Sequence, residues 1–260
     1  MKIGVFDSGL GGLTVVKAMT KVIKGAEIFY VADTKNAPYG EKTPEQILQY
    51  SLDITKFLTE KHHIDTLIVA CNTATSAAIQ EIRKQYPELI VIGTEPGIKP
   101  AFEQTETGKV GVLATPATLK GEKYQQLANV LSSQKEVALF EQACPGLVEQ
   151  IENGEIHTKK TREMLENWLS PMRKADVDTI VLGCTHYPLV SEIIEDLMER
   201  KLNLISTGDA IAKRLLALSK ESGHRNHGML KGVLYTTDRI SKDIVRNIFD
   251  REIEIKTISL

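Results

Sequence analysis

Two cysteines occupy matching places in this 260-residue sequence. Cys71 directly follows the apolar run at residues 66–70, and Cys184 follows a similar run at residues 179–183. A threonine-containing turn and then a helical pattern come after each of them, so each thiol is expected where a buried strand ends. Two equivalent strand ends that both carry a thiol predict one site with two matched thiols.

Such a pair could invert the configuration of a carbon acid. The unperturbed pKa of cysteine, about 8.5, is close enough to neutral pH for a thiolate to act as a base and a thiol as an acid. One thiolate would remove a proton on one face of the carbon, and the opposite thiol would return a proton on the other face. In principle this reaction requires neither a metal nor an organic cofactor.

An amino-acid α-proton is only weakly acidic, so the site must also stabilise the developing carbanion. Oriented donors to the substrate carboxylate would do this. Backbone amides and hydroxyls suited to that task occur at Ser8, Gly40, Asn72, Thr73 and Thr185.

Three further polar residues could tune the thiols. His186 lies two positions beyond Cys184, Asp7 is expected at a strand end next to that of Cys71, and Glu152 is a carboxylate in the second half. They could pass protons to the thiols or hold them in the required protonation state. A plain cap on the first helix is an alternative for Asp7.

Other chemistries fit the cysteines less well. Cys184 and His186 are too close together for a zinc pair without a second pair nearby, and the absence of CxxC argues against both zinc and dithiol redox chemistry. Cys144, beside Pro145, is expected to be a small buried apolar residue. The adjacent His62 and His63 are expected on the surface at a helix end.

An internal repeat sets the predicted architecture. Residues 109–115 resemble residues 2–8 at an offset of 107, residues 136–140 match 27–31 at 109, and Cys184 matches Cys71 at 113. In this alignment residues 144–146 take the place of residues 38–40. The small drift of the offset is typical of loop insertions, so the repeat predicts two similar lobes about a pseudo-twofold axis.

Buried strands alternate with amphipathic helices, which predicts an α/β protein. We expect two pseudosymmetric three-layer lobes with mostly parallel sheets and the active site in the cleft between them. Residues 1–97 and 210–260 would form the first lobe, and residues 98–209 the second. The Gly-rich loop at residues 7–12 suits a ligand at a helix start. It lacks the third glycine of a dinucleotide motif, where Thr14 stands, and the lysine of a Walker loop.

The charge balance and the cysteine number exclude several classes. With 32 basic and 34 acidic residues the net charge is -2, which predicts neither nucleic-acid nor membrane-surface binding. No apolar run approaches the roughly 20 residues of a membrane span, and residues 1–6 are too short for a signal peptide. Three widely spaced cysteines favour a reducing, cytoplasmic setting over a disulfide framework.

Five stretches together resemble the glutamate racemases, cofactor-independent bacterial enzymes that make D-glutamate for peptidoglycan. They are residues 7–12 (DSGLGG), 38–40 (PYG), 71–74 (CNTA), 95–97 (EPG) and 183–188 (GCTHYP), in the family's order. The departures are mild: Thr75 and Ser76 after the first cysteine motif, and Thr94 before Glu95. The resemblance implies two α/β lobes, an isomerase active in cell-wall biogenesis and cell shape, and commonly a homodimer.

The resemblance also implies roles for residues. Cys71 would take the proton from D-glutamate and Cys184 from L-glutamate, Asp7 would assist Cys71, and His186 with Glu152 would assist Cys184. No metal and no cofactor are implied. The substrate would be contacted by Asp7, Ser8, Pro38, Tyr39, Gly40, Asn72, Thr73, Thr115, Thr118, Thr185 and His186.

Two alternatives remain open at this point. One is a racemase of aspartate or another acidic amino acid, which would share the two-thiol plan. The other is a two-lobed protein that binds an amino acid without catalysis, which would not need two matched cysteines. The sequence carries no signal for a further role with a protein partner.

Overall fold

The computed structural model describes residues 1–94, 97–134, 136–249 and 253–260. The chain forms two compact units, Met1–Thr94 with Gly208–Leu260, and Glu95–Thr207. Two residues of the EPG stretch, Glu95 and Pro96, lie outside the described residues. Among the described helices none is long and apolar enough to cross a membrane.

The first unit is built on a sheet of six parallel strands. These are β1 (Lys2–Asp7), β2 (Glu27–Ala32), β3 (Thr66–Val69), β4 (Ile90–Gly93), β9 (Lys231–Thr236) and β10 (Ile255–Thr257). Their order is β10-β9-β2-β1-β3-β4. The C-terminal strands β9 and β10 therefore complete a sheet that the N-terminal strands begin.

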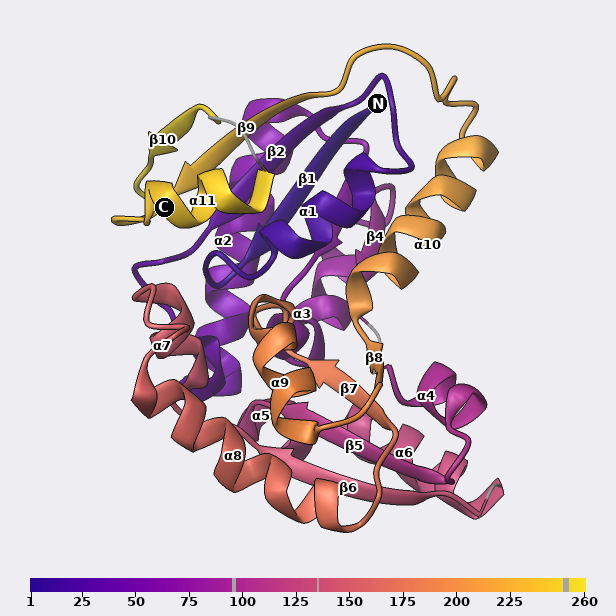
Figure 1. The fold of residues 1–260 in the computed structure, drawn as a ribbon. Coiled ribbons are helices and arrows are strands. Elements are labelled where there is room, and N and C mark those ends of the chain that lie inside the picture. The colour runs from indigo at the N-terminus through magenta and orange to yellow at the C-terminus, as the bar shows by residue number, and fades with distance from the viewer. Residues whose placement is uncertain (95–96, 135, 250–252) are drawn as a thin grey trace. The chain divides into compact units, whose positions relative to one another are not determined.

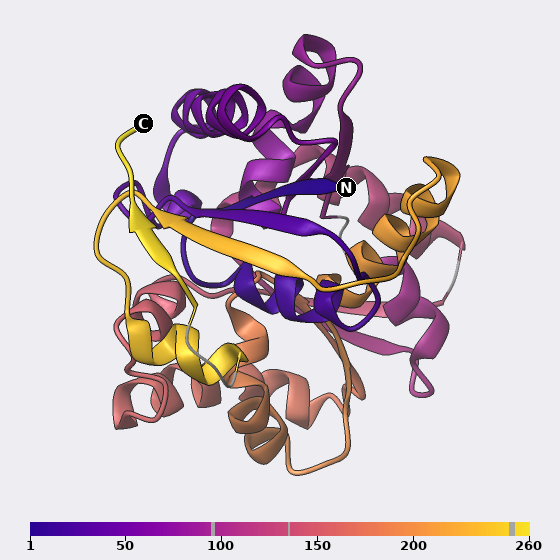
Figure 2. The same cartoon turned by 90° about the horizontal axis from the view of Figure 1, so that it is seen from above.

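Helices cover both faces of this sheet. They are α1 (Leu13–Thr20), α2 (Pro44–His62), α3 (Asn72–Gln85), α10 (Thr207–Glu221) and α11 (Lys242–Phe249), with a 3-10 turn η1 (Tyr39–Glu41). Helices α2 and α3 pack on one face around a core that includes Phe6, Leu58 and Leu67, while α1 and α11 lie on the other face (Figures 1 and 2).

The second unit repeats this plan with four parallel strands. These are β5 (Lys109–Ala114), β6 (Ala138–Ala143), β7 (Thr179–Gly183) and β8 (Asn203–Ile205), in the order β6-β5-β7-β8. One face carries α7 (Leu147–Glu152), α8 (Lys159–Lys174) and α9 (Ser191–Met198). The other face carries α4 (Ile98–Gln104) and α6 (Glu122–Gln134), preceded by the short α5 (Pro116–Lys120). The predicted α/β class with parallel sheets is confirmed.

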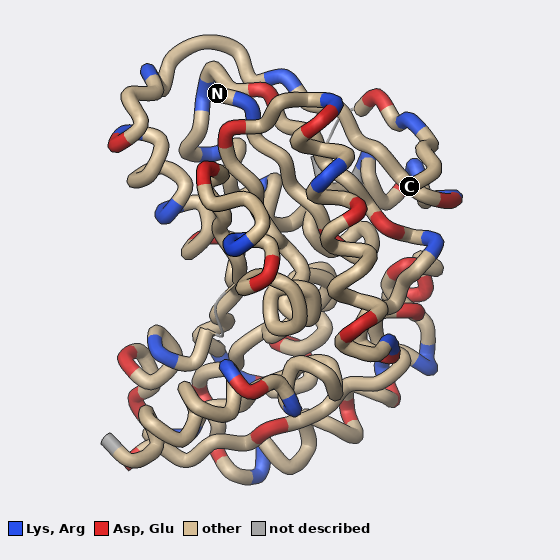
Figure 3. The backbone as a smooth tube through the Cα atoms, turned by 180° about the vertical axis from the view of Figure 1, so that it is seen from behind, with Lys and Arg blue, Asp and Glu red and all other residues tan. Residues whose placement is uncertain are grey.

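Basic and acidic residues are interspersed along the chain in both units (Figure 3). This distribution matches the nearly balanced composition of 32 basic and 34 acidic residues.

The strand registers correct the alignment of the repeat. Ile3 pairs with Ile28 and Thr66, whereas Val110 pairs with Leu139 and Thr179. The offsets are therefore 107 (110 − 3), 111 (139 − 28) and 113 (179 − 66), so the sequence-based value of 109 for the second strand is wrong. Two apolar strand patterns slide past each other by two residues without losing their alternation, which is why the sequence did not reveal the error.

The corrected register changes which residue of the first unit Cys144 matches in the repeat. Cys144 follows β6 as Asp33 follows β2, since Ala32 and Ala143 end the two strands. Cys144 therefore does not take the place of residues 38–40, as the sequence alignment had it.

Three helix starts have distinct local structures. Helix α3 begins at Asn72, directly after Cys71, which is its N-cap. A 3-10 turn η2 (Tyr187–Val190) precedes α9. At the start of α2, Thr43 and Gln46 form a reciprocal capping box, with Pro44 at the first helical position.

The loop before α2 and the end of α2 hold two further features. The Ala37–Pro38 peptide bond is cis. His62 stacks on Phe29 with ring centroids 4.0 Å apart and also contacts Phe57 and Tyr235. The prediction of a surface position is therefore wrong for His62, which is half-buried in an aromatic cluster, and right for the exposed His63.

Thr75 and Thr94, two of the departures from the family pattern, are hydrogen-bonded to each other. The buried Thr75 Oγ1 donates to Val69 O at 3.1 Å and accepts from both Thr94 N and Thr94 Oγ1 at 3.1 Å. One hydroxyl thus joins the end of β3, the first turn of α3 and the residue after β4. It fixes the backbone on both sides of Cys71.

We expect Thr75→Val to lower the free energy of unfolding by about 1–3 kcal/mol, because it keeps the shape but leaves buried backbone groups without a partner. Thr75→Ser keeps the hydroxyl and should lose less. Denaturant unfolding followed by circular dichroism measures both. Equal stability of the valine variant and the wild type would contradict this role of the hydroxyl.

Candidate functional site

Cys71 lies at the junction of β3 and α3. It is buried, it is the N-cap of α3, and its Sγ accepts a hydrogen bond from Ala74 N at 3.4 Å. Strand β3 ends two residues earlier, and the helix begins at once with Asn72. Backbone N–H groups at a helix N-terminus favour a negatively charged group, and a thiolate would be such a group.

Asp7 ends the neighbouring strand β1, which pairs with β3 through Phe6 and Val69. Its carboxylate is fully buried, and Oδ2 accepts hydrogen bonds from Gly9 N and Gly12 N at 3.1 Å. Gly12 is the N-cap of α1, so Asp7 makes the contacts of a loop and helix cap. A methyl group added at Gly12 would lie 2.6 Å from Asp7 Cβ, so this close turn requires glycine.

The other predicted residues of the first unit gather at the same edge of the sheet. Ser8 follows β1, residues 38–40 lie in the loop after β2, and Asn72 and Thr73 follow Cys71. Asn72 Oδ1 is buried and has no hydrogen-bond partner among the described residues. A buried acceptor without a donor costs free energy, so Asn72 suits a ligand that brings an N–H group.

The hydroxyl of Tyr39 is hydrogen-bonded within the protein. Its Oη donates to Asp33 Oδ2 at 2.6 Å. Burial, the Asp33 charge and this hydrogen bond raise the pKa of Tyr39 well above its usual value, and the charges of Cys71 and Asp7 act in the same direction. The phenol therefore stays protonated, and Tyr39 lies close to both of those residues.

Asp33 is a residue that the sequence analysis missed. It follows β2 directly, as Asp7 ends β1, and the place of a polar residue at a strand end was the signal that could have revealed it. The charge balance and the motifs gave no hint of its hydrogen bonds.

In the second unit, Cys184, His186 and Glu152 form a connected chain. Cys184 Sγ lies 3.7 Å from His186 Nδ1, and His186 Nε2 lies 2.5 Å from Glu152 Oε1. Burial disfavours a charge on His186, but the hydrogen bonds to Cys184 and Glu152 outweigh it and raise the pKa of the imidazole well above its usual value. His186 can therefore hold a proton next to the thiol at neutral pH.

Three threonines lie beside this chain of groups. Thr115 follows β5 where Ala114 pairs with Gly183, the residue before Cys184. Thr115 Oγ1 caps α5 by accepting from Thr118 N at 3.2 Å, and it donates to Thr118 Oγ1 at 2.9 Å. Thr185 Oγ1 is 3.4 Å from His186 Nδ1. All three predicted threonines are buried at the carboxyl edge of the second sheet.

Cys144 differs from the other two cysteines. It packs in the apolar core of the second unit with Leu147 and Tyr187. Burial, reinforced by the neighbouring Cys184, raises the pKa of the Cys144 thiol well above its usual value. It therefore remains a neutral, buried thiol. Cys71, Cys144 and Cys184 are all described, and they form no disulfide.

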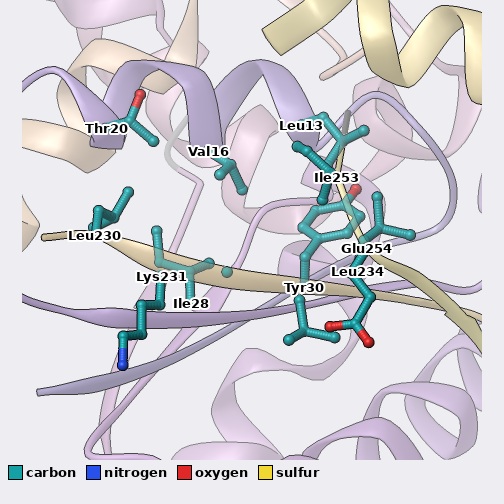
Figure 4. Close-up of a pocket in the computed structure, with 12 residues that line it drawn as sticks. Leu13, Val16, Thr20, Ile28, Tyr30, Leu230, Lys231, Leu234, Ile253 and Glu254 are labelled. Carbon is teal, nitrogen blue, oxygen red and sulfur yellow. The ribbon is translucent and has the colours of Figure 1, made fainter. Parts of the chain in front are cut away.

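A separate pocket of about 220 Å³ lies in the first unit between α1 and the strands β2 and β9 (Figure 4). Its lining is mixed: apolar side chains such as Leu13 and Leu234 share it with Thr20, Lys231 and Glu254. None of the predicted site residues lines it. Within the described part of the chain, no group of three or more His, Cys, Asp or Glu side chains is arranged to hold a metal ion.

The predicted residues thus form two sets at the carboxyl ends of two parallel sheets. Asp7, Ser8, residues 38–40 and Cys71 to Thr73 belong to the first unit. Thr115, Thr118, Glu152 and Cys184 to His186 belong to the second unit. That the two sets meet around one ligand stays a prediction.

Comparisons with known proteins show the family of the chain. The family model "Asp/Glu/Hydantoin racemase" matches residues 3–215. A glutamate racemase of Sulfurovum sp. is 66% identical over 260 residues, which are 100% of this chain and 98% of the relative. A solved glutamate racemase isoform from Bacillus anthracis has a TM-score of 0.87 at 29% identity, covering 99% of this chain and 97% of that one.

A glutamate racemase from Francisella tularensis, solved in complex with D-glutamate, has a TM-score of 0.84 at 26% identity. It covers 99% of this chain and 97% of that one. The resemblance inferred from the five stretches is thereby confirmed, and the chain belongs to the Asp/Glu/hydantoin racemase family.

Proposed function

We propose that this protein is a glutamate racemase that interconverts L- and D-glutamate with two cysteines and without a cofactor. The observation that carries the proposal is the equivalence of Cys71 and Cys184. Each follows the strand that pairs with the first strand of its own unit, β1 or β5, at the offset of 113 that the registers give. Cys71 Sγ accepts a hydrogen bond from Ala74 N at the start of α3, and Cys184 Sγ lies 3.7 Å from His186 Nδ1.

The reaction has two proton transfers. The Cys71 thiolate takes the α-proton of D-glutamate, and the electron pair of the broken C–H bond remains on the carbon, delocalised into the carboxyl group. The Cys184 thiol then protonates the opposite face, which gives L-glutamate and leaves a thiolate on Cys184. The reverse direction begins from that state, so no further reactant is required.

The neighbouring groups support these transfers. His186, held by Glu152, keeps a proton beside Cys184, and Asp7 lies near Cys71 on the paired strand. Asn72, with its buried and unpartnered Oδ1, suits the substrate ammonium group. Hydroxyls and backbone N–H groups would bind the substrate carboxylates and stabilise the carbanion. The residues that would supply them are Ser8, Gly40, Thr73, Thr115, Thr118 and Thr185.

The relatives support glutamate as the substrate. The Sulfurovum relative is named a glutamate racemase, and the Francisella structure contains D-glutamate. An aspartate racemase would use the same pair of thiols, so substrate choice requires its own measurement. A non-catalytic amino-acid-binding protein would have no use for two matched thiols.

The resemblance extends the proposal to the cell. We propose that the enzyme works in the cytoplasm as a homodimer and supplies D-glutamate for peptidoglycan.

Two matched substitutions test the mechanism. We expect Cys71→Ala and Cys184→Ala each to lower the rate of racemisation by about 10²-fold or more, because each removes one of the two acid–base groups. Proton NMR of L-glutamate in D2O follows the exchange of the α-proton, and a chiral assay follows D-glutamate. Aspartate in the same assay tests the alternative substrate.

Cys144→Ala is the matched control and should retain a rate within a few-fold of the wild type, since this thiol is neutral and packed in the core. A wild type that binds glutamate without exchanging its α-proton would favour the non-catalytic alternative. Racemisation by either of the two alanine variants at the wild-type rate would show that the two-thiol mechanism is wrong.

The pH dependence tests the role of Glu152. Its hydrogen bond and charge help to raise the pKa of His186, so Glu152→Gln should lower that pKa, and the imidazolium should lose its proton at a lower pH. We therefore expect the alkaline limb of the kcat/KM profile for L-glutamate to move to lower pH.

Glu163→Gln is the control for this profile. It makes the same change on the exposed surface of α8, where Glu163 pairs with Lys159. Its profile should match that of the wild type. An unshifted profile for Glu152→Gln would mean that the Glu152–His186 contact does not govern the ionisation that limits the rate.

A further inference from the structure

A buried carboxylate, that of Asp33, is the first of two anchors that hold the loop at residues 33–40. Asp33 is 1% exposed, and its backbone N–H donates to Asp7 O at 3.0 Å. The side chain points into its own loop, where it meets Asn36 and Tyr39. All of these contacts lie within the first unit.

Four hydrogen bonds reach the Asp33 carboxylate. Oδ1 accepts from Asn36 Nδ2 at 3.1 Å and from Thr237 Oγ1 at 2.8 Å. Oδ2 accepts from Asn36 Nδ2 at 3.0 Å and from Tyr39 Oη at 2.6 Å. An ionised carboxylate has about four acceptor sites, so none is left to bind a substrate. Asp33 can act only through the residues that it holds.

The second anchor comes from the C-terminal part of the chain. Thr237 follows β9, and its backbone N–H donates to Ala32 O at 3.1 Å. Its hydroxyl donates to Asp33 and accepts from Lys35 N at 3.0 Å. Next to it, Thr34 Oγ1 contacts Thr236 Oγ1 at 2.8 Å and accepts from Asp238 N at 3.0 Å. The turn at residues 236–238 therefore fixes the first half of the loop.

Tyr39 connects the anchored loop to the residues of the candidate site. Its hydroxyl is committed to Asp33, and its ring is buried in the same core as Cys71 and Ala74. Tyr39 and Gly40 lie in the turn η1, and both are among the residues proposed to contact the substrate. The buried and hydrogen-bonded side chain of Tyr39 therefore sets the position of the backbone that would contact the substrate.

We propose that Asp33 and Thr237 are positioning residues that hold the backbone of Tyr39 and Gly40 in place for the substrate. The inference rests on the proposed racemase function and adds two residues to it. Neither residue takes part in proton transfer. Their loss should weaken substrate binding and change the chemical step much less.

The test compares initial rates over a range of L- and D-glutamate concentrations for four variants. Asp33→Asn replaces one acceptor oxygen by a donor that faces other donors, so KM should rise about tenfold while kcat changes about threefold or less. Thr237→Val removes one donor and leaves Lys35 N without its acceptor, so KM should rise several-fold. Thr237→Ser keeps the hydroxyl and should restore a KM close to that of the wild type.

Asp53→Asn is the matched control, because Asp53 lies on the exposed face of α2 with Gln49 as its partner. Its kinetic constants should equal those of the wild type. Unfolding midpoints measured in parallel show whether Asp33→Asn folds. If it does not fold, the KM values of Thr237→Val and Thr237→Ser decide whether the positioning role is right.

The outcomes separate this inference from the proposed function. A wild type that does not racemise glutamate overturns both. A wild type that racemises glutamate, together with folded Asp33→Asn or Thr237→Val enzymes whose KM is unchanged, overturns the positioning role alone. A KM raised in Thr237→Val and restored in Thr237→Ser supports it.

Discussion

The parallel pairing of neighbouring strands is the constraint on which the site depends. Because β1 and β3 run in the same direction and in fixed register, the residues that follow them, Ser8 and Cys71 among them, come out at one edge of the sheet. The pairing of β5 with β7 does the same for Thr115 and Cys184. A slip of one residue in either register would turn the thiol-bearing segment to the other face of its sheet.

The two units stabilise buried charge in different ways. In the second unit, His186 and Glu152 form a close pair of groups of opposite charge, next to a thiol. In the first unit, the Asp33 carboxylate is surrounded by neutral hydroxyl and amide donors. The first arrangement lets a proton move, whereas the second satisfies a charge that stays in place. The difference fits the separate roles that we propose for these residues.

The sequence predicted the parts of the fold that depend on local patterns. The apolar runs that precede Cys71 and Cys184 form strands, and the predicted α/β class agrees with the structure. The offset of the second strand could not be obtained, because runs such as residues 27–31 and 136–140 match almost equally well at several offsets. The partners of Asp33 were also hidden, since Thr237 is distant along the chain and joins it only because β9 pairs with β2.

The residues of the candidate site were recognisable by type and by resemblance, but their hydrogen bonds were not. Nothing in the sequence shows that Asp7 binds the amides of Gly9 and Gly12, or that the hydroxyl of Tyr39 is already used by Asp33. Such pairings depend on the path of the backbone through loops, and composition and periodicity contain little information about it.

The chain of contacts from Cys184 has a consequence for how its proton equilibrates with water. The imidazole of His186 is 1% exposed, whereas the side chain of Glu152 is 19% exposed. A proton on the sulfur therefore has a hydrogen-bonded route through the imidazole to a carboxylate that water reaches. Asp7, by contrast, is completely buried and bound to backbone amides. The carboxylates near the two thiols thus differ in solvent access, so a proton on Cys184 has a route to water through its neighbours that Asp7 does not give to Cys71.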